Sequence, residues 1–148
     1  MNLKDRLSND LKQAIRQGDE RRKSTIRLVR AAITNAEIER GKELGDEEVL
    51  AIIASQVKQR RESVTEFARG GRQDLVDQEE EELRILLGYL PAQMSRQEIE
   101  VAARQVIAEV GATGLAQMGE VMRRLMPQVK GKADGSLVNQ VVREILSG

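Results

Sequence analysis

The sequence predicts an all-α protein, with an N-terminal bundle of long helices followed by a small C-terminal bundle of three short helices. The main observation is periodicity, because apolar residues recur at three- and four-residue spacing almost from end to end of the 148-residue chain. In the N-terminal part, no alternating run of strand length competes with this pattern. The composition agrees, since 32% of the residues are charged and the apolar ones are mostly aliphatic, as is typical of helical proteins.

Four helices are expected in the N-terminal part, and glycines end the first three. Leu7 and Leu11 lie on one face of the first helix. Asp46 is a candidate N-cap of the third helix, because a capping carboxylate accepts backbone hydrogen bonds and further acidic residues follow in the first turn. The expected ranges are 3–17, 19–40, 47–69 and 74–87.

The segment Gly88-Tyr89-Leu90-Pro91 interrupts the helical pattern, since proline disfavours helix at the residue before it. A new helix then starts at Ser95, where Glu98 completes a capping box. A sixth helix is expected to end at Pro127 and a seventh to begin near Ser136. We therefore predict an N-terminal helical domain, residues 1–90, and a small C-terminal helical domain, residues 95–148.

The composition excludes several classes of function. The chain has no Cys and no His, so it can form neither a disulfide, a Cys or His zinc site, nor a Ser-His-Asp triad. Two aromatic residues, Phe67 and Tyr89, are too few for a platform on which bases stack. We expect no catalytic residue, no metal and no cofactor. Without an apolar run of membrane length or a signal core, the sequence predicts a cytoplasmic protein with no membrane partner.

The zero formal net charge conceals an uneven distribution. Residues 1–42 carry a net charge of +5, residues 43–88 a net charge of −6, and residues 89–148 a net charge of +1. Lys23, Arg27 and Arg30 fall on one side of the second helix. This stripe either contacts the phosphates of a nucleic acid or is a solvated face paired with nearby acids.

Two charged residues fall inside apolar arcs, Arg60 on the third helix and Glu79 on the fourth. Because charges stay buried only when paired, we predict an ion pair between them; the alternative is that both reach water. The acidic run Glu79-Glu80-Glu81-Glu82 is expected to be helix N-terminal charge and a solvated face, the alternative being a cation site, for which four consecutive carboxylates converge poorly. The methionines Met118, Met122 and Met126 share one side of the sixth helix and are expected to be core, the alternative being an adaptable binding surface.

The segment 130–135, Lys-Gly-Lys-Ala-Asp-Gly, is a further candidate site, named here loop 130–135. Lys130 and Lys132 flank a glycine that lets the backbone approach an anion, although the spacing is not that of a phosphate-binding loop. The alternative is a plain helix connection in which Asp134 or Ser136 caps the seventh helix.

These segments together resemble the GatB/YqeY family, specifically its free-standing YqeY-like proteins. The resemblance covers essentially the whole chain and rests on Gln-Arg-Arg-Glu-Ser at 59–63, Gly-Tyr-Leu-Pro at 88–91, Met-Gly-Glu-Val-Met at 118–122 and loop 130–135. It implies an all-α fold of two domains. It also implies a relation to the tail of the GatB component of the tRNA-dependent amidotransferase, a carbon-nitrogen ligase with glutamine as amido-N-donor, in which the tail contacts the tRNA body.

The ligase chemistry of that enzyme belongs to other domains, for which this chain has neither the length nor a nucleotide-binding motif. We therefore expect a non-catalytic module that binds tRNA or another structured RNA through Lys130 and Lys132 first, then Lys23, Arg27 and Arg30. The alternative is a protein-interaction scaffold that docks an amidotransferase or synthetase component. Catalysis by the chain itself is a third and weaker interpretation.

Overall fold

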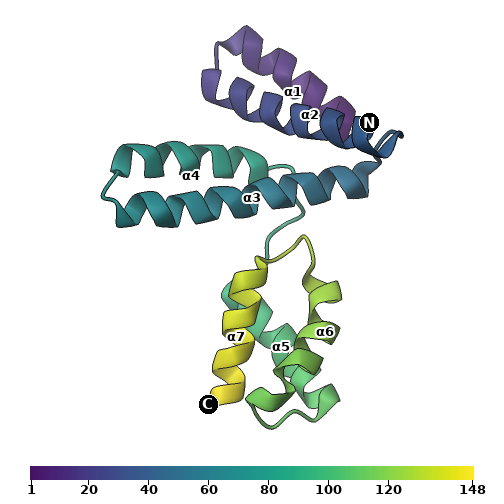
Figure 1. Ribbon diagram of the computed structural model, residues 1–148, viewed down its shortest axis with the longest axis vertical. Helices are drawn as coiled ribbons and strands as arrows, with labels where there is room; N and C mark the ends of the chain where they lie inside the picture. Colours follow the sequence, from purple (N-terminus) through teal and green to yellow (C-terminus); the bar gives the residue numbers. More distant parts are fainter. The chain divides into compact units, whose positions relative to one another are not determined.

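The computed structural model describes all 148 residues, and its regular structure is entirely helical (Figure 1), which confirms the predicted all-α class. The chain forms two compact units, Met1–Leu90 (unit 1) and Pro91–Gly148 (unit 2). None of the helices combines the length and the apolar character that crossing a membrane requires. The helices of unit 1 are α1 (Leu3–Gln17), α2 (Glu20–Arg40), α3 (Asp46–Arg69) and α4 (Gln73–Leu87), and unit 2 contains α5 (Arg96–Val110), a 3₁₀ turn (Leu115–Gln117), α6 (Met118–Val129) and α7 (Gly135–Ser147).

Unit 1 consists of two helical hairpins, α1 with α2 and α3 with α4 (Figure 1). The first hairpin turns at Gly18, whose φ of 69° is left-handed and therefore suits glycine. Asp19 then caps α2 by accepting a hydrogen bond from the Arg22 backbone N–H at 3.1 Å. The two hairpins share one apolar core, made by Leu7, Leu11, Ile26, Val29, Ile33, Leu44, Val49, Ile53, Val57, Leu86 and Tyr89.

The start of α3 corrects one expectation. Gly45, not Asp46, is the N-cap, and Asp46 is the first helical residue. Its carboxylate accepts a hydrogen bond from the backbone N–H of Leu3, 2.9 Å away at the start of α1. A carboxylate at this position still favours the helix through its dipole, but its hydrogen bond ties two helix starts together instead of capping its own.

An ion-pair network joins α2, α3 and α4 around Glu82, the one buried charged residue of the chain, whose residue surface is 6% exposed. Glu82 Oε1 lies 3.4 Å from Arg21 Nη1 on α2, and Glu82 Oε2 lies 3.4 Å from Arg60 Nε on α3. Arg60 Nη1 is also 3.4 Å from Glu79 Oε2, so the two residues predicted as a pair lie together. The expectation of a solvated acidic run is wrong for Glu82, because residues 79 and 82 share the face of α4 that meets α3 and α2.

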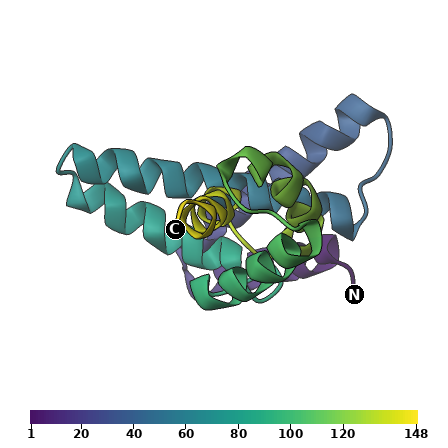
Figure 2. The same cartoon turned by 90° about the horizontal axis from the view of Figure 1, so that it is seen from below.

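Unit 2 packs α5, α6 and α7 around its own apolar core, and Figure 2 looks along α7 with the other two helices beside it. The capping box at α5 is present: Ser95 Oγ accepts from the Glu98 N–H at 3.2 Å, and Glu98 Oε1 accepts from the Ser95 N–H at 3.1 Å. Met118, Met122 and Met126 are partly buried against this core.

The expected end of the sixth helix at Pro127 is wrong, since α6 continues to Val129. Pro127 removes one backbone hydrogen bond and crowds the carbonyl four residues before it, but its own φ is helical, so the residues after it can continue the helix. The added turn places Val129, which is 1% exposed, in the core of unit 2. The Lys130 N–H donates to the Met126 carbonyl at 2.9 Å and closes the helix.

Replacing Glu82 with alanine is expected to destabilise unit 1 by about 3 kcal/mol, because it leaves Arg21 and Arg60 facing each other without the carboxylate between them. Glu80→Ala, in the exposed part of the same run, should change the free energy of unfolding by less than about 0.5 kcal/mol. Urea unfolding followed by the fluorescence of Tyr89, the sole Tyr in a chain without Trp, reports on unit 1. Equal stabilities of the two variants would contradict a structural role for this network.

Candidate nucleic-acid interface

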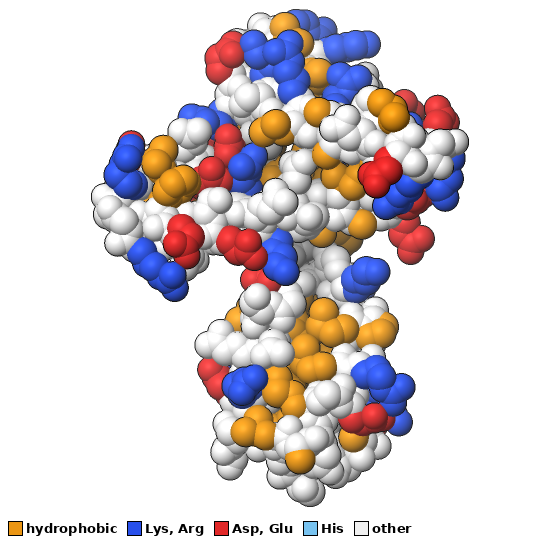
Figure 3. All heavy atoms as spheres, viewed as in Figure 1, with side chains coloured by type: hydrophobic (Ala, Val, Ile, Leu, Met, Phe, Trp, Pro, Cys, Tyr) orange, Lys and Arg blue, Asp and Glu red, His pale blue; other side chains and the backbone are white.

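The basic stripe of α2 divides into one paired and two unpaired side chains. Lys23 Nζ lies 3.0 Å from Glu20 Oε2, one turn earlier on the same helix. Arg27 and Arg30 are exposed and form neither a hydrogen bond nor an ion pair. Figure 3 shows Lys and Arg side chains gathered over α1 and α2 at the top of the view. Two of the three predicted residues are therefore available to an external anion.

The exposed surface of α2 also carries aliphatic side chains. Leu28, next to Arg27 in the sequence, is 51% exposed, and Ile38, in the last turns of the helix, is 75% exposed. Apolar residues consequently occur around most of α2, and the core-facing ones are Ile26, Val29 and Ile33. This surface combines positive charge with apolar area, which differs from the purely polar face that phosphate contact alone requires.

Loop 130–135 is held in place by its backbone. The Lys132 carbonyl accepts a hydrogen bond from the Met94 N–H at 2.7 Å, and the Gly131 carbonyl accepts one from Gln93 Nε2 at 3.1 Å. Gly131 has a φ of 78°, which favours glycine at the centre of the turn. Lys130 and Lys132 are exposed, and their ammonium groups have no partner in the protein. The loop thus presents two free cations on a fixed backbone.

The start of α7 shows how an anion could approach this loop. Asp134, one of the two candidate caps, accepts a hydrogen bond from the Ser136 N–H at 3.1 Å and is the N-cap. Because its carboxylate occupies the place where an anion would meet the helix N-terminus, the N-terminal dipole of α7 is already used. An anion at loop 130–135 would therefore have to be held by the lysine side chains.

The structure brings some of the predicted residues together and leaves others separate. Lys130 and Lys132 share one loop of unit 2, and Arg60 and Glu79 form one ion pair of unit 1. The α2 residues Lys23, Arg27 and Arg30 belong to unit 1.

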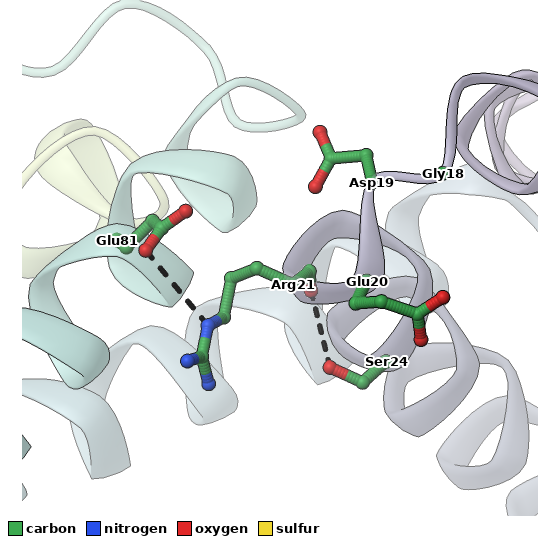
Figure 4. Close-up of a pocket in the computed structure, with 6 residues that line it drawn as sticks. All are labelled: Gly18, Asp19, Glu20, Arg21, Ser24 and Glu81. Atoms are coloured by element: carbon green, nitrogen blue, oxygen red, sulfur yellow. Dashed lines mark hydrogen bonds and ion pairs between the residues drawn. The ribbon is translucent and has the colours of Figure 1, made fainter.

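A hollow of about 480 Å³ beside the turn between α1 and α2 is lined by polar groups (Figure 4), which are Gly18, Asp19, Glu20, Arg21, Ser24 and Glu81. Its charged groups already have partners in the protein. Arg21 Nε is 3.8 Å from Glu81 Oε2, and Glu20 pairs with Lys23. No group of three or more Asp and Glu residues converges in the molecule as metal ligands would. The hollow offers neither an anion site nor an apolar pocket.

Tyr89, in the segment that separates the predicted domains, belongs to the core of unit 1. It is 7% exposed, its hydroxyl donates a hydrogen bond to Asp10 Oδ2, and the Arg6 guanidinium carbon lies 4.6 Å from the centre of its ring. Arg6 Nη2 also donates to the Gly88 carbonyl at 2.9 Å. Burial, and then the hydrogen bond to Asp10, raise the pKa of Tyr89. The segment therefore fastens the end of α4 to α1.

Sequence reasoning missed the partners of two residues. Asp10 lies 79 positions from Tyr89, and nothing in either local sequence links them. Glu82 carried a usable signal, because Glu79 and Leu86 lie one turn before and after it on the same face of α4. That spacing predicts that Glu82 lies on the same face of α4 as Glu79, beside the predicted Arg60–Glu79 ion pair.

Comparison with known proteins identifies relatives along most of the chain. A family model described as "Yqey-like protein" matches residues 4–146. A protein named "Altered inheritance of mitochondria protein 41, mitochondrial" from Pyrenophora tritici-repentis is 31% identical over 145 residues, which cover 95% of this chain and 79% of the relative. Proteins of the same name from Kluyveromyces lactis and Eremothecium gossypii are 36% and 39% identical, over 70% and 66% of this chain. The matches span 58% and 54% of those two relatives, little more than half their length.

The cytoplasmic location predicted from the sequence is contradicted by these names, which describe the relatives as mitochondrial proteins, and it is withdrawn. The prediction rested on the absence of an apolar signal core and of cysteine. Neither feature distinguishes the cytosol from another compartment of soluble proteins.

The stability of unit 1 is expected to fall as the pH rises above about 10, the ordinary pKa of tyrosine. The unfolded chain then loses the Tyr89 proton that the folded chain retains, because the folded pKa is raised. Tyr89→Phe should cost about 1 kcal/mol near neutral pH, because the hydrogen bond to Asp10 is absent, and should remove this alkaline decline. Absorbance titration of the single tyrosine, with urea unfolding at each pH, measures both effects. Ionisation near pH 10 in a protein that stays folded would contradict the assignment.

Proposed function

This chain belongs to the YqeY-like protein family, and from that premise we propose that it is a non-catalytic RNA-binding module whose main contact is loop 130–135. The observation that carries the proposal is the pair of exposed, unpartnered ammonium groups of Lys130 and Lys132 on a loop fixed by backbone hydrogen bonds. Cations that have no internal partner gain the most from contact with phosphates. A loop that is already ordered loses little entropy when it binds.

The proposed ligand is tRNA or another structured RNA. The reason is the resemblance to the tail of the GatB component of the tRNA-dependent amidotransferase, in which the tail contacts the tRNA body. In this proposal, other proteins carry out the carbon-nitrogen ligase chemistry with glutamine as amido-N-donor, and this chain binds the RNA. Recognition would use phosphates and RNA shape, because the chain holds only two aromatic residues.

Arg27 and Arg30 on α2 form a secondary contact in this proposal. Both are free of internal partners, and they lie in the segment 1–42 with a net charge of +5. The zero net charge of the chain weakens long-range attraction to RNA, but such local positive regions still direct a polyanion to one face.

A second candidate function is a scaffold that docks a protein, such as an amidotransferase or synthetase component. The observation that favours it is the exposure of Leu28 and Ile38 on α2, since exposed aliphatic side chains suit a protein surface better than phosphates. A purified amidotransferase or synthetase component that binds the unmodified chain but not Leu28→Ser/Ile38→Ser, in nuclease-treated samples, would support the scaffold.

Removing both loop lysines should weaken tRNA binding and its dependence on salt. For Lys130→Ala/Lys132→Ala, we expect the slope of log K against log salt concentration to fall by about two, one for each phosphate that is no longer neutralised. This slope is measured by fluorescence anisotropy with labelled tRNA at salt concentrations between about 50 and 200 mM.

The matched control is Lys58→Ala/Arg104→Ala, which removes two exposed, unpartnered cations from α3 and α5. It lowers the net charge equally and should leave most of the affinity and slope intact. If both double variants lose binding equally, charge alone explains the affinity and the assignment to loop 130–135 fails. If the unmodified chain binds no RNA, the proposed function itself fails.

A further inference from the structure

The exposed face of α7 continues loop 130–135 as a row of hydrogen-bond donors. Ser136, Asn139 and Arg143 are exposed and recur at three- and four-residue spacing, which places them on one face of the helix, named here the α7 strip. The strip starts four residues after Lys132. It extends for about 10 Å along the helix axis, at 1.5 Å per residue.

The α7 strip contains no acidic side chain. The one carboxylate of α7, Glu144, pairs with Arg96 on α5 and accepts from Gln140 Nε2 at 3.2 Å. Arg143 therefore has no internal partner, although an acidic residue follows it directly in the sequence. The strip joins an unneutralised arginine to two small polar side chains.

The other two helices of unit 2 neutralise most of their cations. Both arginines of α6, Arg123 and Arg124, pair with Glu120, at 2.8 and 3.2 Å. On α5, Arg96 pairs with Glu100 at 3.3 Å as well as with Glu144. Within unit 2, the unpaired cations besides Arg104 are thus Lys130 and Lys132 on loop 130–135 and Arg143 on the α7 strip, and Asp134 lies between the loop lysines and Ser136 in the chain.

The chemistry of this surface indicates which form of RNA it fits. Unit 2 contains no Phe, Tyr or Trp, because Phe67 and Tyr89 both lie in unit 1. Recognition of unpaired bases relies on stacking against aromatic side chains, which unit 2 does not have. Double-stranded RNA instead displays phosphates and 2′-hydroxyl groups across a wide, shallow minor groove. Asn and Ser side chains both donate to and accept from a hydroxyl.

We propose that the α7 strip, together with loop 130–135, binds the minor-groove side of double-stranded RNA. Lys130, Lys132 and Arg143 contact phosphates, and Asn139 and Ser136 contact 2′-hydroxyl groups. This inference rests on the proposed RNA-binding function and adds the ligand class and three residues to it.

The test compares Asn139→Ala/Arg143→Ala with the unmodified chain on three probes of one sequence: an RNA hairpin stem, the corresponding DNA duplex and the single-stranded RNA. We expect about tenfold weaker binding of the RNA stem by the double variant, because it can form neither the charged hydrogen bond to phosphate nor the neutral one to a 2′-hydroxyl. The unmodified chain should prefer the RNA stem over both other probes. Arg143→Lys should restore most of the affinity that Arg143→Ala loses, because it restores the charge.

The matched control is Arg104→Ala/Gln105→Ala on α5, which removes one arginine and one amide that are also exposed and unpartnered. It should bind the RNA stem within about twofold of the unmodified chain, a small effect by the usual scale of remote surface changes. If Asn139→Ala/Arg143→Ala behaves like this control while Lys130→Ala/Lys132→Ala loses binding, the α7 strip is excluded and the RNA-binding function stands. Tighter binding of single-stranded RNA or of DNA also overturns the inference. Absence of binding to every probe overturns both proposals.

Discussion

The buried carboxylate of Glu82 is the interaction on which the arrangement of unit 1 depends. The helix α2 buries Ile26, Val29 and Ile33 in the core of unit 1, while aliphatic side chains also occur on its exposed surface. The ion pair from Arg21 to Glu82 fixes one side of α2 against α4, and Arg60 fixes α3 to the same carboxylate. With that side turned inward, Arg27 and Arg30 face solvent. The core contacts of Ile26, Val29 and Ile33 and this ion pair together set the orientation of α2 that leaves the residues proposed to meet RNA exposed.

Features of the fold could be predicted from the sequence where their physical causes lie within a few residues. The helix ends at glycines and the Ser95 capping box depend on neighbours within four residues. Accordingly, the helices lie within a residue or two of the expected ranges. The expectation for Asp46 was wrong because its hydrogen bond is to the distant Leu3 N–H. The expected helix end at Pro127 was wrong because the burial of Val129 depends on the packing of unit 2. Tyr89 and Asp10 are 79 positions apart, so their hydrogen bond could emerge only from the folded chain.

The candidate site shows the same limit. Sequence spacing placed Lys130 and Lys132 on a loop and Lys23, Arg27 and Arg30 on one side of a helix, yet it could not distinguish paired from unpaired cations. Pairing depends on which carboxylates other helices bring near. Lys23 meets Glu20 within its own helix, whereas Arg143 stays unpaired beside Glu144, which Arg96 of α5 holds. The α7 strip therefore became visible only when the partners of each carboxylate were known.

The distribution of unpaired cations also separates the two candidate functions. The helix that carries the free arginines, α2, also exposes Leu28 and Ile38, and exposed aliphatic groups gain nothing from a phosphate backbone. On unit 2 the free cations stand beside Ser136 and Asn139, whose hydroxyl and amide groups can replace water in contact with a sugar hydroxyl. Positive charge is common to both surfaces, so the neutral neighbours decide which ligand each surface suits. By that criterion, the proposed RNA-binding function would be centred on unit 2, and the scaffold alternative would depend on α2.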